Sequence, residues 1–193
     1  GLVTSVDHKD HYTRQHSEDV TVHAVTIASR MGLSIETQRT LRVAALLHDI
    51  GKIGIPDHIL RKPAELNDDE QEIIKNHVML GELIIHGIPG QEEVVGAVGS
   101  HHERFDGKGY PRGLSGESIP VLGRILAAAD AYSAMTTDRP YGEGLPPEEA
   151  KAELRRIAGT QLDPEITVVL LECLEDSETG DETDLAVSAA RRV

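Results

Sequence analysis

The sequence predicts an all-α protein that folds as a single bundle-like domain of about seven helices. The first observation is compositional: hydrophobic residues make up 39% of the 193 residues, yet there is no Trp and only one Phe. The core must therefore be built from Leu, Ile, Val and Ala. The second is that these residues recur at helical spacing, while no segment has the period of two that is typical of a strand. The third is that no internal repeat or low-complexity linker divides the chain.

Two helices are expected in the N-terminal quarter of the chain. Residues 13–31 carry apolar side chains every three or four positions, and Gly32 follows as a helix terminator. Ser34 can begin a second helix, over residues 34–49, because its hydroxyl can accept a hydrogen bond from the backbone of Thr37. The glycines and proline of residues 51–56 then force a loop.

Two further helices precede the middle of the chain. Asn67 or Asp68 can cap the third helix, which is expected to continue to Ile84. Pro89 and Gly90 break the chain, after which valines at helical spacing predict a fourth helix over residues 94–102. The loop of residues 106–120 holds too many glycines and prolines to be helical.

Three helices complete the prediction. They cover residues 121–135, a segment that begins at about 148 after two prolines, and residues 164–174, which an Asp-Pro pair opens. Acidic residues crowd the end of the chain. We therefore expect one domain over residues 1–175 and an acidic tail over residues 176–193.

The composition excludes several classes of function. A formal net charge of −14 argues against binding to DNA or RNA polymers through their phosphates. The sequence contains no run of 18 apolar residues, so we expect no membrane segment in this chain. Cys173 is the only cysteine, which excludes an internal disulfide and a cysteine-rich zinc site. A reducing, cytoplasmic setting is the expectation.

Histidines and aspartates fall on the apolar faces of the predicted helices. His48, for example, lies four residues after Ala44 and seven after Leu41. Burying so many imidazoles and carboxylates without a compensating charge is costly, and metal ions supply that charge. The alternative for each histidine alone is a core imidazole that bonds a backbone carbonyl. The residues predicted to point inward, from five helices, are His16, His48, Asp49, His77, His101, His102 and Asp130.

The His48-Asp49 pair suggests a centre with two metal ions. Neighbouring residues of a helix point about 100° apart, so the pair can address two ions, with Asp49 bridging them through its two oxygens. Lys52 lies just beyond on a glycine-flanked turn, where it can reach a phosphate oxygen. The alternative for Lys52 is an ordinary solvated lysine.

The chain resembles the HD-GYP family, a branch of the HD phosphohydrolase superfamily that hydrolyses cyclic di-GMP. The resemblance covers roughly residues 10–170. It is carried by the signature block at residues 48–56, the block at residues 101–111 that ends in Gly109-Tyr110-Pro111, and later blocks at residues 129–132, 138–141 and 159–164.

The resemblance implies an all-helical HD-domain fold with a metal centre of two or three ions, often iron or manganese. Carried over residue by residue, the seven inward histidines and aspartates named above would be the metal ligands. Lys52, Tyr110 and Arg139 would contact the dinucleotide. Tyr110 offers an aromatic face for a guanine, and Arg139 a two-pronged contact for a phosphate.

Three positions depart from the family pattern. Members with a third metal carry a Glu where this chain has Tyr12, so we expect two ions. An Asp often follows the last ligand where this chain has Ser133, and a basic residue is common where it has Gly142. These changes leave the predicted ligands intact and bear on substrate affinity.

The leading hypothesis is a metal-dependent phosphodiesterase that hydrolyses cyclic di-GMP to pGpG, GMP or both by a metal-activated hydroxide, with Asp49 and Lys52 as catalytic residues. Iron or manganese is favoured, and nickel or zinc also suits histidine and carboxylate ligands. The alternatives are a catalytically weak receptor or partner-binding module, and a phosphodiesterase for another cyclic dinucleotide such as cyclic GMP-AMP. A homodimer, an upstream sensor or receiver domain and regulatory protein partners are compatible with the sequence.

Overall fold

The computed structural model describes residues 13–138 and 143–179. Within these ranges the backbone forms α-helices and short 3-10 turns, with no strand and a single isolated bridge between Ala158 and Leu162. The predicted all-α fold is confirmed.

The N-terminal elements follow the prediction, except that the second helix ends at Leu47 and leaves His48 and Asp49 in the turn after it. Gly32, with φ of 71°, ends the first helix, and the Ser34 side chain caps the second by accepting from the backbone N–H of Thr37. A short 3-10 turn and a single-turn helix then occupy the predicted loop. These elements are α2 (Thr13–Arg30), α3 (Ile35–Leu47), η1 (Ile50–Gly54) and α4 (Asp57–Leu60).

The middle of the chain differs from the prediction in two places. The third predicted helix is divided at Asn76 into α5 (Asp68–Lys75), which Asn67 caps, and α6 (His77–His86). The fourth, α7 (Glu92–Val98), ends before the histidine pair, so the expectation that His101 and His102 share a helix is wrong.

The C-terminal elements match the prediction. They are η2 (Gly116–Ser118), α8 (Val121–Thr136), α9 (Pro147–Ile157) and α10 (Pro164–Thr179). The last of them extends four residues beyond the expected end of the domain at residue 175. The boundary there stays a prediction.

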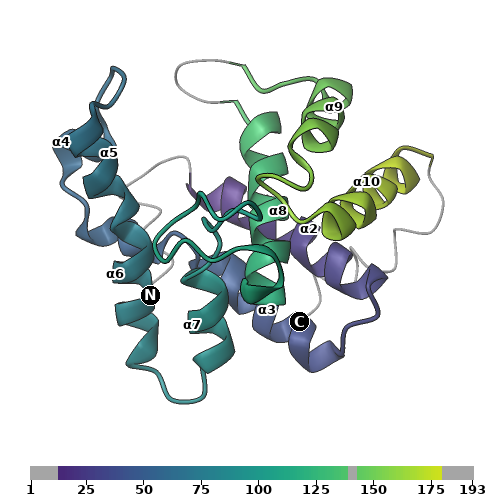
Figure 1. Ribbon diagram of the computed structural model, residues 1–193, viewed down its shortest axis with the longest axis horizontal. Helices are drawn as coiled ribbons and strands as arrows, with labels where there is room; N and C mark the ends of the chain where they lie inside the picture. The colour runs from purple at the N-terminus through teal and green to yellow at the C-terminus, as the bar shows by residue number, and fades with distance from the viewer. Residues whose placement is uncertain (1–12, 139–142, 180–193) are drawn as a thin grey trace.

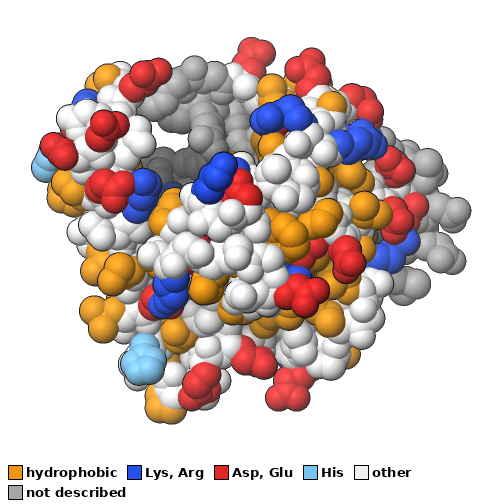
Figure 2. Space-filling model, in the orientation of Figure 1, with side chains coloured by type: hydrophobic (Ala, Val, Ile, Leu, Met, Phe, Trp, Pro, Cys, Tyr) orange, Lys and Arg blue, Asp and Glu red, His pale blue; other side chains and the backbone are white. Residues whose placement is uncertain are grey.

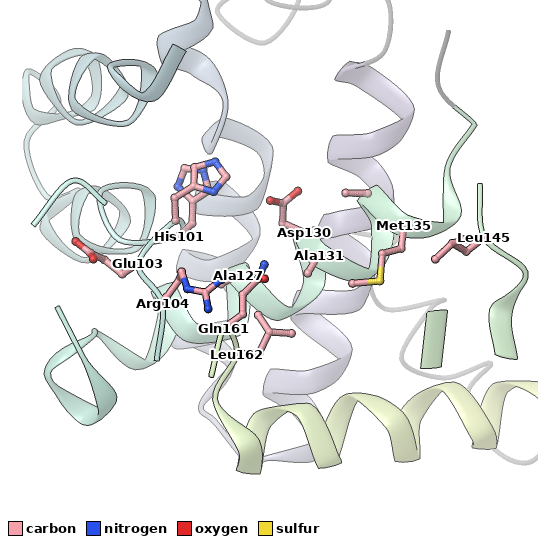
Figure 3. Close-up of a pocket in the computed structure, with 12 residues that line it drawn as sticks. His101, Glu103, Arg104, Ala127, Asp130, Ala131, Met135, Leu145, Gln161 and Leu162 are labelled. Atoms are coloured by element: carbon pink, nitrogen blue, oxygen red, sulfur yellow. Dashed lines mark hydrogen bonds between the residues drawn. The ribbon is translucent and has the colours of Figure 1, made fainter. Parts of the chain in front are cut away.

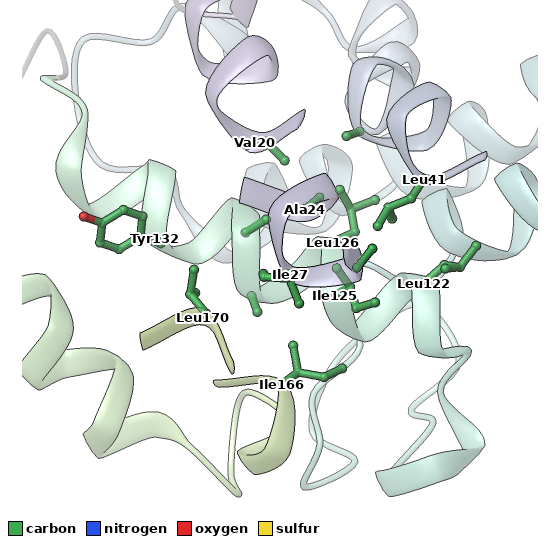
Figure 4. Close-up of a cluster of buried hydrophobic side chains, with 14 of the residues drawn as sticks. Val20, Ala24, Ile27, Leu41, Leu122, Ile125, Leu126, Tyr132, Ile166 and Leu170 are labelled. Carbon is green, nitrogen blue, oxygen red and sulfur yellow. The ribbon is translucent and has the colours of Figure 1, made fainter. Parts of the chain in front are cut away.

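Helix α8 is the centre of the fold (Figure 1), where α2, α3, α7, α9 and α10 all pack against it. Two fully buried alanines, Ala128 and Ala129, let its neighbours approach closely. Aliphatic side chains from α2, α3 and α10 complete the core around Ile125 and Leu126 (Figure 4). Because α8 also carries Asp130, the main core fixes one wall of the site described below.

The surface carries acidic and basic side chains side by side. On the face shown in Figure 2, carboxylates are spread over the whole surface and interrupt the lysines and arginines. Across the described residues, every helix is too short or too polar to cross a membrane.

Candidate metal centre

Three histidines of the predicted ligand set lie just beyond the C-terminal ends of α3, α5 and α7. In each, the ring atom Nδ1 bonds the carbonyl oxygen three residues earlier, one of the carbonyls that a helix end leaves without a helical partner. Because a carbonyl oxygen only accepts, the proton lies on Nδ1 and the lone pair on Nε2. These bonds join His48 to Ala45 at 2.7 Å, His77 to Ile74 at 2.8 Å and His101 to Val98 at 2.6 Å.

This capping explains why the helices end where they do. In an uninterrupted helix the Ile74 carbonyl would accept only from the backbone four residues later. Here it bonds the His77 ring, while the backbone N–H of Asn76 donates to the Ile73 carbonyl at 3.2 Å, and α5 stops. The C-terminal ends of α3, α5 and α7 also bring partial negative charge to the site, which favours a cation.

The Nε2 atoms of His77 and His101 test whether the site suits a metal ion. Both atoms are buried, and neither has a hydrogen-bond partner in the described part of the chain. Both side chains are only 2% exposed. A buried imidazole nitrogen without a partner is costly, whereas a metal ion would satisfy it. The residues therefore fit a metal ion.

The ligand atoms form two groups, each within 4.8 Å: His77 with His101 and His102, and His16 with His48 and Asp49. Asp49 connects them. Its Oδ2 lies 3.5 Å from Nε2 of His48, and its Oδ1 lies 3.5 Å from Nε2 of His77. This is the arrangement expected of a carboxylate shared between two ions.

Asp130 belongs to the same cluster. Its Oδ1 lies 3.0 Å from Nε2 of His16 and 3.9 Å from Nε2 of His48. The structure thus brings together all seven side chains that the sequence analysis named, from five separate stretches of chain. That they bind metal stays a prediction.

The electrostatics of the site suit cation binding at neutral pH. Burial lowers the pKa of His102 to about 4 and that of His101 well below its usual range, so both imidazoles are neutral. Burial alone would raise the pKa of Asp49, but Lys52 and two imidazoles hold it well below its ordinary value. The pKa of Asp130 is lowered too, against burial, chiefly by its bond to His16. Two carboxylates and neutral imidazoles together attract cations.

Gly51 permits the close packing of η1 on α6 that this geometry needs. A Cβ atom at Gly51 would lie 1.8 Å from the His77 carbonyl oxygen and 2.6 Å from the Gly81 backbone nitrogen. Only glycine allows so close a backbone approach. The glycine after the predicted His48-Asp49 pair therefore sets the distance between Asp49 and His77.

Tyr110 lies against the histidine pair. Its ring stacks on His102, with centroids 4.9 Å apart and planes at 26°, and Nζ of Lys75 lies 5.7 Å from the ring centroid. The Tyr110 backbone N–H donates to the His102 carbonyl at 3.1 Å. The loop after the pair is thus folded back on it as a wall, and a contact of Tyr110 with a guanine stays a prediction.

Lys52 is held beside the cluster, with its Nζ 2.7 Å from Oδ2 of Asp49 and its side chain 22% exposed. It therefore lies between the predicted metal ligands and solvent. Arg139, the third predicted substrate contact, lies outside the described residues, as do Tyr12 and Gly142.

Two residues with clear roles in the site were missed or misread from the sequence. Ser133, treated above only as a departure that bears on substrate affinity, is buried, and its Oγ lies 2.9 Å from Nδ1 of His16. Its position three residues after Asp130 on α8 was the available signal. Glu103, 3% exposed, accepts from the backbone N–H groups of Arg112 and Leu114 and so anchors the loop.

A cavity of about 540 Å³ opens beside the cluster (Figure 3). His101 and Asp130 face it from one side, Arg104 and Gln161 from another, and Met135 with other apolar side chains from α8 lines the rest. Its volume is within the range of small-molecule sites.

Three of the known proteins that this chain resembles match it over similar lengths. The chain is 38% identical over 169 residues to the 3'3'-cGAMP-specific phosphodiesterase 3 of Vibrio cholerae, covering 88% of this chain and 37% of that one. It is 40% identical over 172 residues to the cyclic di-GMP phosphodiesterase response regulator RpfG of Xanthomonas campestris, with 88% and 46% covered. It is 42% identical over 167 residues to a cyclic di-GMP phosphodiesterase of Thermotoga maritima, with 86% and 45% covered.

This chain thus spans less than half the length of these curated relatives. Among solved structures, the crystal structure of V-cGAP3 of V. cholerae superposes with a TM-score of 0.74 at 20% identity, covering 98% of this chain and 51% of that one. This likeness supports the fold.

A family model described as HD domain matches residues 5–166. The match includes His48-Asp49 and the Gly109-Tyr110-Pro111 block, both of which lie at the cluster of buried histidines. The chain belongs to the HD domain family, in its HD-GYP branch.

Proposed function

We propose that this chain is a metal-dependent phosphodiesterase that hydrolyses cyclic di-GMP to pGpG, GMP or both. One observation carries the proposal: Asp49 directs one oxygen toward each of two groups of buried histidines. Such a carboxylate suits a pair of divalent ions, and paired ions are a common device for phosphodiester hydrolysis. The choice of cyclic di-GMP as the substrate is supported by the relatives that are named as cyclic di-GMP phosphodiesterases.

The ligands that would hold two ions are the seven clustered side chains. His16, His48 and Asp130 would serve one ion, His77, His101 and His102 the other, and Asp49 both. When bound, the ions supply a water molecule of lowered pKa and positive charge for the scissile phosphate. Iron or manganese is favoured, with nickel or zinc as alternatives, because the ligands are imidazoles and carboxylates without thiolate.

The remaining roles fall to residues beside the cluster. Lys52 sits at the rim, where its ammonium can exchange Asp49 for a phosphoryl oxygen and stabilise the charge that develops there. The Tyr110 ring, backed by His102, offers the wall for a nucleobase. Arg139 would add a second phosphate contact.

Cyclic GMP-AMP is the second candidate substrate, because a V. cholerae relative that matches over 88% of this chain is named for it. The two cyclic dinucleotides share their phosphodiester bonds and differ in one base. The chemistry above serves either, so the choice depends on groups that read the base.

The test is a product assay with a matched histidine control. The protein is reconstituted with Mn²⁺ or, without oxygen, Fe²⁺, and is incubated with each cyclic dinucleotide; products are separated by chromatography. His77→Gln should abolish hydrolysis and metal uptake, whereas His86→Gln, at the exposed end of the same helix, should leave both unchanged. Intact cyclic di-GMP after incubation with metal-loaded protein that binds it would overturn the proposal and favour a receptor.

A further inference from the structure

The cavity beside the metal centre has a polar end that the proposed chemistry does not use. Arg104 and Gln161 form this end, away from Asp130, and the alanines of α8 lie between them (Figure 3). The two residues come from loops that are joined by backbone hydrogen bonds: Phe105 N–H donates to the Gln161 carbonyl at 3.1 Å, and Asp106 N–H to the Thr160 carbonyl at 2.8 Å. Their relative position is therefore fixed by the backbone.

Arg104 is committed to its neighbours in the protein. Its Nε and Nη2 donate to the two oxygens of Asp106 at 3.0 and 2.7 Å. Its Nη1 donates to Oε1 of Gln161 at 3.3 Å. These bonds use three of the five N–H groups of the guanidinium, and the Asp106 carboxylate offsets its charge.

The contact with Arg104 fixes the orientation of the Gln161 amide. A guanidinium only donates, so the oxygen of Gln161 must face Arg104 and its NH₂ group must face the other way. In the part of the chain that the structure describes, no protein group accepts from this NH₂. Its amide end points into the cavity (Figure 3). The Gln161 amide therefore presents an oriented donor group to the cavity.

The rest of the cavity suits a flat, largely apolar ring. Ala127 and Ala131 on α8, with Leu162 beside Gln161, form an apolar surface between the polar end and Asp130. A nucleobase would lie on this surface with its edge toward Gln161, while its phosphate lay near the metal ligands. Ligand sites commonly combine such apolar walls with a few placed polar groups.

We infer that Gln161 reads the base of the bound nucleotide and selects guanine over adenine. Guanine presents two acceptors, O6 and N7, on one edge, whereas adenine presents an amino donor in place of O6. A donor held at this edge can bond both O6 and N7 of guanine but only N7 of adenine, whose amino group opposes it, so the fixed donor favours guanine. The inference rests on the proposed function and assigns the base that the site prefers.

GMP and AMP separate base recognition from hydrolysis, because they share ribose and phosphate. Their affinities for the metal-loaded protein are measured by calorimetry, and kcat/KM is measured for cyclic di-GMP, cyclic GMP-AMP and cyclic di-AMP. The wild-type protein should prefer GMP by about tenfold or more, since a well-placed base contact discriminates by that amount. Gln161→Glu keeps the shape and the contact with Arg104 but replaces the donor by an acceptor, so the preference should fall at least tenfold. Gln161→Leu should bring the two affinities close together.

Gln71→Glu is the matched control, because it makes the same change at an exposed position on α5. It should leave the ratio unchanged, and thermal unfolding should show that all variants are folded. Equal affinity of the wild-type protein for GMP and AMP, or a ratio that Gln161→Glu leaves unaltered, would overturn the inference. Absence of hydrolysis with the GMP preference intact and dependent on Gln161 would refute the proposed function alone.

Discussion

Gly51→Ala should separate η1 from α6 and so dismantle the metal centre without touching a ligand. The added Cβ would lie 1.8 Å from the His77 carbonyl oxygen, 2.6 Å from the Gly81 nitrogen and 2.7 Å from the His77 carbonyl carbon. All three are backbone atoms, so no flexible side chain can move aside. Restoring an ordinary contact of 3.4 Å from 1.8 Å requires a displacement of about 1.6 Å.

A displacement of this size exceeds what the cluster can tolerate. Metal–ligand distances hold to within about 0.2 Å, and η1 follows directly on Asp49 while α6 begins at His77. The Oδ1 of Asp49 and Nε2 of His77, now 3.5 Å apart, would no longer meet the same ion. Overpacking typically costs about 1–3 kcal/mol of folding free energy, and each kcal/mol lowers Tm by roughly 2–4 °C at this chain length.

The assay is metal stoichiometry by mass spectrometry after dialysis against Mn²⁺, with thermal unfolding of the metal-free protein alongside. Gly96→Ala is the control, because a Cβ there meets no atom within 4 Å and the position lies within α7. It should keep the metal and match or raise Tm, since alanine favours a helix. If Gly51→Ala retained the metal content and Tm of the wild-type protein, the packing of η1 on α6 would not position Asp49.

Three further predictions concern Ser133, His23 and the binding of Mn²⁺. Ser133→Ala removes the hydrogen bond to Nδ1 of His16, so calorimetry should show Mn²⁺ binding about 10–100-fold more weakly, and unchanged affinity would contradict this role. Burial lowers the pKa of His23 to about 4 from 6.5, so the folded metal-free protein binds fewer protons than the unfolded chain between these values. The contribution of His23 to the free energy of unfolding is therefore complete above pH 6.5 and falls as the pH drops to 4. In urea unfolding, His23→Gln should reduce this loss of stability by up to about 3 kcal/mol. An equal loss in both proteins would refute the lowered pKa of His23. Free Mn²⁺ at about 100 times its Kd should stabilise the wild-type protein by about 2.7 kcal/mol, measured as a rise in Tm that EDTA reverses. A Tm that neither Mn²⁺ nor EDTA changes would count against a metal site.

The sequence predicted most of the fold because the signals for helices are local. The capping side chains of Ser34 and Asn67 and the terminator Gly32 act within a few residues of their own position, and each lies where the structure ends or begins a helix. The division at Asn76 could not be predicted in this way. It depends on the His77 ring bonding the Ile74 carbonyl, which in turn depends on what lies opposite His77 in the folded protein.

The sequence predicted which residues lie together in the candidate site, but not how the backbone places them there. Placing His101 and His102 on one helical face named two side chains that do lie in the cluster, but the placement itself was wrong, since both lie in the turn after α7. Ser133 was read as a substitution that bears on substrate affinity, and its bond to His16 spans 117 residues of chain. No local pattern reports a contact at that separation.

The sequence by itself determined the helical class, most of the helices, the histidines and aspartates that cluster in the fold and the resemblance to HD-GYP proteins, because all of these depend on residue type and spacing. Only the tertiary structure decided that Asp49 joins two groups of histidines, that Gly51 sets their separation, and that Gln161 turns a donor into the cavity. Each of these depends on backbone segments that are far apart in the chain and meet within a few ångströms. Their positions are fixed by packing around α8, which no single segment encodes.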